Sequence, residues 1–150
     1  MNGIDVSEHQ GDFDFTPYKD GFVIIRGGYG IRNVDKWAER NIAKCDALGI
    51  PWGIFWYSYA LNGHTAKLEA ERCLRFLNGR KPRLGVWFDM EDADGYKAYN
   101  GFPSNETITA MCLVLPHFLR SKLGNLGFFE ESVENLVAQL FRALGKFTIR

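Results

Sequence analysis

The sequence predicts an α/β fold built on a parallel β-sheet, and three observations support this prediction. Short apolar runs alternate along the chain with segments of helical periodicity, which is the pattern of βα units. One run, residues 22–26, is continuously apolar and β-branched before its final arginine, as a strand buried in a parallel sheet usually is. The last strand-like run leads directly into acidic residues, at the strand end where such folds carry their chemistry.

Four strands are predicted in order. Gly3–Val6 is a short apolar segment near the start, and residues 22–26 (FVIIR) form the second strand. Residues 52–60 (WGIFWYSYA) are rich in aromatic and β-branched side chains, which favour strands. Residues 84–90 (LGVWFDM) form the fourth strand. Arg26 follows an apolar run, so we expect it to pair with a buried acid.

Two helices are predicted between these strands. Residues 35–48 and 65–78 both place apolar side chains at amphipathic helical spacing. Each is followed by a glycine, Gly49 and Gly79, which is a common residue just after the end of a helix.

The pattern changes after the fourth strand. A third helix is predicted to begin near Thr107, where Ser104 or Asn105 can cap it. No βα repeat follows Leu113, and residues 132–144 instead have the spacing of a strongly amphipathic helix. We therefore divide the chain into residues 1–113 and an atypical helical tail, residues 114–150.

Composition excludes several classes of function. A chain of 150 residues suits one domain, and with 46% hydrophobic residues it can bury a core. Lysine plus arginine and aspartate plus glutamate both number 18, so the formal net charge is +0 and no basic patch predicts a nucleic-acid partner. No apolar run is long enough to cross a membrane, and the N-terminus lacks the basic and apolar regions of a signal peptide.

A metal site is not predicted either. The three cysteines, Cys45, Cys73 and Cys112, have no CxxC spacing, and the three histidines are scattered. The odd count argues against a disulfide framework, and the first two cysteines fit small buried apolar residues of the helices. Gly28-Tyr29-Gly30 does not continue into a dinucleotide fingerprint, because Asn33 occupies the position of the third glycine.

Three acids are the candidate catalytic residues. Asp89 and Glu91 are two positions apart at the end of the fourth strand, so both can point to one face and one pKa of the pair should rise. A protonated acid beside an ionised one is what glycosidic bond cleavage requires. Asp5 belongs to the same predicted sheet edge. Each has a simpler interpretation. Asp89 and Glu91 can be solvated acids of a loop that continues with Asp92 and Asp94, and Asp5 can cap the turn that follows it.

The aromatic residues of this edge also have two interpretations. Tyr29, Trp56, Tyr57 and Tyr59 can stack on the apolar faces of sugar rings, or they can fill the core. On a strand, Tyr57 and Tyr59 share one face and Trp56 takes the other. We expect one of these sets in a cleft and the other in the core.

Several of these segments together resemble glycoside hydrolase family 25, the Chalaropsis-type lysozymes found among phage endolysins and bacterial autolysins. The resemblance rests on residues 3–7 (GIDVS) with Gln10-Gly11, residues 22–30 (FVIIRGGYG), residues 56–60 (WYSYA) and residues 87–91 (WFDME), in that order. It extends from Gly3 to about Leu113.

This resemblance implies a flattened β/α barrel that cleaves, with retention, the β-1,4 bond between N-acetylmuramic acid and N-acetylglucosamine in peptidoglycan. Glu91 matches the general acid, and Asp89 its partner, which orients the substrate's acetamido group or stabilises charge. Asp5 matches the carboxylate of the first strand. Tyr29, Tyr57 and Tyr59 match positions along the substrate groove, and Trp56 is counted with them as a substrate-binding candidate. Neither a metal nor an organic cofactor is implied.

The sequence departs from the family pattern after Asp94, because no later aspartate supplies the fourth acid of the family. We therefore expect an incomplete TIM-like β/α barrel that ends in an atypical helical tail, as in a truncated, frame-shifted or divergent member. The helix predicted at residues 132–144 would cover the open sheet or drive oligomerisation; the oligomeric state is left open. The function expected is a muramidase acting on the bacterial cell wall, outside the cell or after release from a host cytoplasm. The alternative is a non-catalytic peptidoglycan-binding or vestigial fragment of such an enzyme.

Overall fold

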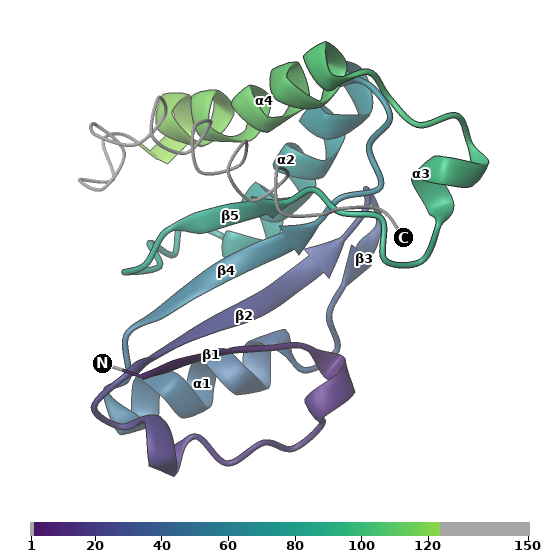
Figure 1. Ribbon diagram of the computed structural model, residues 1–150. Helices are drawn as coiled ribbons and strands as arrows, with labels where there is room; N and C mark the ends of the chain where they lie inside the picture. The colour runs from purple at the N-terminus through teal and green to yellow at the C-terminus, as the bar shows by residue number, and fades with distance from the viewer. Residues whose placement is uncertain (1, 124–150) are drawn as a thin grey trace.

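A computed structural model of the chain describes residues 2–123, and these form a parallel sheet with helices packed against one face (Figure 1). The main strands are β1 (Gly3–Val6), β2 (Phe22–Tyr29), β4 (Trp52–Tyr57) and β5 (Val86–Asp89). They lie side by side in the order β1-β2-β4-β5, and each adjacent pair is parallel. The parallel α/β fold predicted from the sequence is confirmed.

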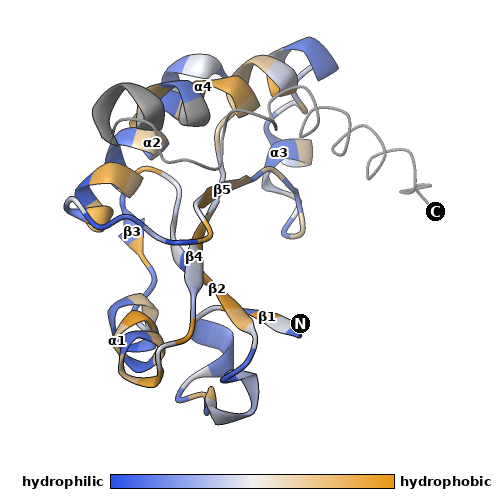
Figure 2. Cartoon of the chain, turned by 90° about the vertical axis from the view of Figure 1, so that its left-hand side faces the viewer, coloured by the Kyte–Doolittle hydropathy of each residue, from blue (hydrophilic) through white to orange (hydrophobic). Residues whose placement is uncertain are grey.

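Helices connect the later strands, as expected for βα units. The helix α1 (Ala38–Leu48) joins β2 to β4, and α2 (Gly63–Leu77) joins β4 to β5. After β5 come the short α3 (Tyr96–Tyr99) and the long α4 (Asn105–Leu123), which packs along α2. In the view of Figure 2, turned from that of Figure 1, α1 and α2 are seen to lie on one side of the strands.

Two 3-10 turns take the place of a helix between the first two strands. These are η1 (Glu8–Gln10) and η2 (Thr16–Tyr18). The two-residue strand β3 (Asn33–Val34) pairs antiparallel with the end of β2, and the sequence analysis did not predict it. Its register with Gly28 and Tyr29 extends β2 beyond the predicted end at Arg26.

The predicted helices differ from the observed ones mainly at their ends. The first begins at Ala38 and not at residue 35, because the carboxylate of Asp35 accepts a hydrogen bond from the main chain of Trp37, at 2.9 Å, in a turn. In α2, Asn62 accepts from the N–H of Thr65 at 3.0 Å and so fixes an earlier start. Ser104 caps α4, accepting from the N–H of Thr107 at 3.3 Å. The helix predicted at residues 132–144 lies outside the described residues.

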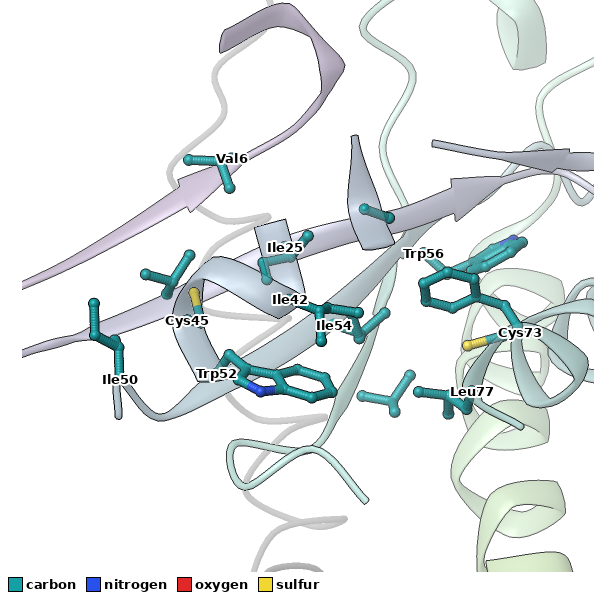
Figure 3. Close-up of a cluster of buried hydrophobic side chains, with 14 of the residues drawn as sticks. Val6, Ile25, Ile42, Cys45, Ile50, Trp52, Ile54, Trp56, Cys73 and Leu77 are labelled. Carbon is teal, nitrogen blue, oxygen red and sulfur yellow. The ribbon is translucent and has the colours of Figure 1, made fainter. Parts of the chain in front are cut away.

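The core lies between the sheet and its helices (Figure 3). Alternate residues of the strands point into it, and Val23, Ile25, Ile54 and Trp56 have no exposed surface. The buried Cys45 and Cys73 come from α1 and α2, so their predicted role as small apolar core residues is confirmed. The strand residues between these, such as Ile24 and Phe55, point to the opposite face, on which Trp87 of β5 is 46% exposed.

Candidate active site

The strands end at a carboxyl edge that points toward α3 (Figure 1), and the predicted acids and tyrosines lie at this edge. Tyr29, Tyr57 and Asp89 occupy one continuous register row across β2, β4 and β5. Because paired residues of parallel strands project to the same side, their side chains share the face opposite the helices. Asp5 lies on the same face, since its neighbours Ile4 and Val6 point into the core.

Asp89 is the half-buried centre of the acid group. Burial raises its pKa to about 6, and the negative charge of Glu91 and a hydrogen bond shared with it act in the same direction. The charge of Asp5 raises the pKa further, whereas that of Lys97 lowers it. All three predicted acids are therefore close enough to interact. The structure places the raised pKa on Asp89, whereas the family resemblance gives the role of the acid to Glu91.

Glu91 lies just beyond β5, because the strand ends at Asp89. Its loop is held by Asp92, whose carboxylate accepts from the main chain of Lys97 at 2.6 Å and of Ala98 at 2.9 Å. Asp92 is therefore a structural residue of the loop and not simply a solvated acid.

A pair of buried charged residues lies beneath this edge, and the sequence analysis missed it. Glu69 and Lys97 are each 1% exposed. Glu69 accepts from the hydroxyl of Ser58 at 2.7 Å and from the main chain of Tyr59 at 2.9 Å. A sequence signal existed for Glu69, which lies three residues after Ala66 and four before Cys73 on the apolar stripe of α2. Nothing in the sequence pattern marks Lys97 as buried.

Tyrosine rings line the edge beside the acids. The ring centroids of Tyr57 and Tyr59 are 5.2 Å apart, and those of Tyr29 and Tyr59 are 6.3 Å apart. Tyr96 of α3, which the sequence analysis did not select, meets Tyr59 edge-on at 5.0 Å and is 41% exposed. The hydroxyl of Tyr59 donates to Asp94 at 2.6 Å, which raises the tyrosine's pKa and lowers that of Asp94. The result is a continuous strip of partly exposed rings.

Trp56 does not belong to this strip, and the prediction that it contacts substrate is corrected. Its side chain has no exposed surface and packs in the core near Phe76, because β4 alternates between the two faces (Figure 3). Its indole N–H donates to the carbonyl of Gly30 at 3.0 Å. A side chain at Gly28 would collide with this indole, since a Cβ there would lie 2.5 Å from the ring. The expectation that Trp56 lies on the opposite face of the strand from Tyr57 and Tyr59 is confirmed.

Arg26 forms the predicted ion pair with a buried acid. Its Nε donates to Asp35 at 2.8 Å and a terminal nitrogen donates to Glu8 at 2.8 Å. The side chain of Asp35 is fully buried and also accepts from the main chain of Glu8 at 2.8 Å. The guanidinium lies 5.2 Å from the ring centroid of Tyr29, so this network holds one end of the tyrosine strip.

Within residues 2–123, no group of histidine, cysteine, aspartate or glutamate side chains is arranged to hold a metal ion. In the same part of the chain, no helix has the length and apolar character needed to span a bilayer. Cys45, Cys73 and Cys112 are free thiols.

The chain is similar to known proteins in both its sequence and its fold. The family described as glycosyl hydrolases family 25 matches residues 4–119. A search of curated proteins gave no match. Among solved structures, a family 25 glycosyl hydrolase from Bacillus anthracis is 25% identical over 81% of this chain and 56% of its own, with a TM-score of 0.68. The modular autolysin LytC from Streptococcus pneumoniae, solved with a synthetic peptidoglycan ligand, is 24% identical over 79% of this chain and 29% of its own, with a TM-score of 0.66.

A third structure, a bacterial lysozyme from Streptomyces coelicolor, is 18% identical over 79% of this chain and 57% of its own, with a TM-score of 0.62. These similarities confirm the fold expected from the sequence. The chain spans between 29% and 57% of the length of the three structures.

Proposed function

Because the chain belongs to glycosyl hydrolase family 25, we propose that it is a peptidoglycan hydrolase of the muramidase type. The bond cleaved is the β-1,4 linkage between N-acetylmuramic acid and N-acetylglucosamine. The observation that carries this proposal is the coupled pair Asp89 and Glu91, beside Asp5 and the tyrosine strip. Its place of action is the bacterial cell wall, outside the cell or after release from a host cytoplasm.

The acid pair suits glycosidic bond cleavage because it can hold one proton and one negative charge together. The raised pKa of Asp89, about 6, results from burial and from the nearby carboxylates, so the pair keeps a proton at mildly acidic pH. Glu91, exposed at the rim, donates a proton to the oxygen of the leaving sugar. Asp89 orients the acetamido group or stabilises the positive charge that develops on the sugar ring. Asp5 adds negative charge to the same centre.

The tyrosine strip would bind the glycan strand. Tyr29, Tyr57 and Tyr59 are half-buried, so each presents part of its ring to the solvent. Sugar rings bind such surfaces through their apolar C–H faces. Because Tyr57 is paired in register with Asp89, a sugar stacked on the strip would lie beside the acids.

A second candidate function is peptidoglycan binding without cleavage. The observation that favours it is the size of the matched region, since the chain spans only 29–57% of the three structures compared. The sequence also has no aspartate after Asp94 to serve as a late fourth acid. Such a protein would keep the tyrosine strip but would not release sugar.

The deciding experiment compares the 150-residue chain with its Glu91→Gln and Glu71→Gln variants on purified peptidoglycan. Turbidity and the release of reducing sugar are followed together, and a pull-down on the same material measures binding. Glu71, on α2, serves as the matched glutamate outside the site. Cleavage by the wild type and Glu71→Gln, lost in Glu91→Gln, supports the muramidase. Binding with no sugar release from any of the three folded proteins supports the second candidate.

A further inference from the structure

Lys97 is a buried cation directly beneath the candidate active site. It is 1% exposed, although lysine is almost never fully buried without a partner. It comes from α3, whose flanking residues are largely exposed, so the burial of this one side chain is a specific feature. Burial lowers the pKa of its ammonium group.

The ammonium group joins the ends of two strands. Its Nζ donates to the main-chain carbonyl of Ser58, the residue after β4, and to that of Glu91, at 2.5 Å. Asp89 lies two residues before Glu91, and its own carbonyl accepts from the N–H of Ser58 at 2.9 Å. Lys97 therefore fixes the main chain of Glu91 relative to the sheet edge.

The charges and rings around Lys97 belong to the same site. Four acids act on it, from α2, from β5 and from the loop after β5: Asp92, Glu69, Asp94 and Asp89. Its Nζ also lies 5.7 Å from the ring centroid of Tyr57 and 5.9 Å from that of Tyr59. The carboxyl of Asp89 in turn interacts with Glu91, Lys97 and Asp5. Lys97 thus contacts or faces both the acid pair and the tyrosine strip.

We propose that Lys97 is a positioning residue of the active site, which fixes the main chain of Glu91 and places a buried positive charge beneath Asp89. The proposal rests on the proposed function for its catalytic consequence, but its structural and electrostatic content does not. A positioning error of about 1 Å can cost about 100-fold in rate, so a single hydrogen bond to the main chain of the acid is sufficient to matter.

The experiment separates electrostatics from activity. In the full chain, the side-chain carboxyl of Asp89 is titrated by carbon NMR, with its signal identified by its absence in Asp89→Asn. The titration is repeated in Lys97→Met, in Lys97→Arg, which keeps the charge, and in Lys81→Met, an exposed lysine control. Loss of the ammonium group removes a cation that favours the Asp89 anion, so the pKa of Asp89 should rise in Lys97→Met only.

Activity is measured on the same four proteins. If the wild type cleaves peptidoglycan, Lys97→Met should lower kcat by about 10- to 100-fold with little change in KM, because the acid is displaced while the tyrosine strip remains. Lys97→Arg should recover part of the loss. If no protein cleaves peptidoglycan but the pKa of Asp89 still rises in Lys97→Met, the proposed function fails and the placement of Lys97 stands.

A measurement on the wild type covers the case in which Lys97→Met does not fold. The side-chain nitrogen of Lys97 is followed by nitrogen NMR, and its chemical shift should change as Asp89 titrates near pH 6. Two results would overturn the proposal. One is a Lys97 nitrogen shift that does not change as Asp89 titrates, and the other is the same pKa of Asp89 in the wild type and in folded Lys97→Met.

Discussion

Tyr57 and Asp89 are the last residues of adjacent parallel strands and are paired directly with each other. The pairing places a phenol ring beside a half-buried carboxyl at the edge of the sheet. Burial raises the pKa of both groups, and the negative charge of Glu91 adds to each effect. One backbone register thus determines both the position of the ring that we propose to bind sugar and the position where a proton can be held.

The first prediction concerns Asp89 and pH. Its folded-state pKa, about 6, is above the ordinary value of 3.8, so the folded chain binds this proton more tightly than the unfolded chain does. The stability contributed by the proton is present below about pH 4 and is lost as pH rises through about 6. Asp89→Asn should therefore be more stable than the wild type at pH 8, by roughly 1 kcal/mol after allowing for solvent screening. Thermal melts at pH 4 and pH 8 test this; an equal difference at both would contradict it.

The second prediction concerns the acid that holds Arg26. Asp35→Ala would remove the acceptor of Arg26 and of two main-chain N–H groups, leaving a buried cation partly unpaired. We expect a loss of about 3–5 kcal/mol in the free energy of unfolding. The matched variant is Glu39→Ala, which breaks the surface pair with Arg80 and should cost only about 0–1 kcal/mol. Urea unfolding curves measure both, and similar losses would show that the buried network is not important for stability.

The third prediction contrasts two tryptophans of adjacent strands. Trp56→Ala empties a fully buried site and should cost about 3–5 kcal/mol. Because 46% of the Trp87 surface is exposed, Trp87→Ala should lower the free energy of unfolding by about 1 kcal/mol or less. Chemical denaturation with fluorescence detection distinguishes them. A mild effect of Trp56→Ala would mean that this side chain is not part of the core.

The fourth prediction uses the free thiols as a test of the native core. Burial raises the pKa of Cys45 and Cys73 to about 12, so almost no thiolate forms at pH 8. A thiol reagent should modify them only after denaturant is added. Burial raises the pKa of the half-buried Cys112 as well, and we expect it to react first, but slowly. Mass spectrometry of the labelled chain identifies the sites; rapid labelling of all three without denaturant would indicate a loosely packed core.

The strands and the alternation along them were predictable because burial on a sheet follows a period of two residues. This is why Tyr57 and Tyr59 were separated correctly from Trp56, and why an arginine ending an apolar run implied a buried acid such as Asp35. The list of substrate-binding candidates nevertheless included Trp56, which the same alternation argues against.

The support of the site was not predictable in the same way. Lys97 lies in a polar segment, and its burial depends on a loop that folds back over the end of β4. Periodicity carries no information about such a return, because the contact joins residues 39 positions apart. Glu69 could have been found as a charged residue on an apolar stripe, but its partners Ser58 and Tyr59 could not.

The parallel order of the sheet has a consequence for how quickly the chain can fold. Its strand pairs join Gly3 to Phe22, Val23 to Trp52 and Ile54 to Val86, so each requires a long segment to close before any pairing is gained. Chains dominated by such distant contacts fold slowly for their size, and their apolar strands are exposed to intermolecular association meanwhile. The yield of protein refolded from denaturant should therefore depend on the dilution and on the time allowed. The carboxyl groups of Asp5, Asp89 and Glu91 come together only once the last of these strands has docked.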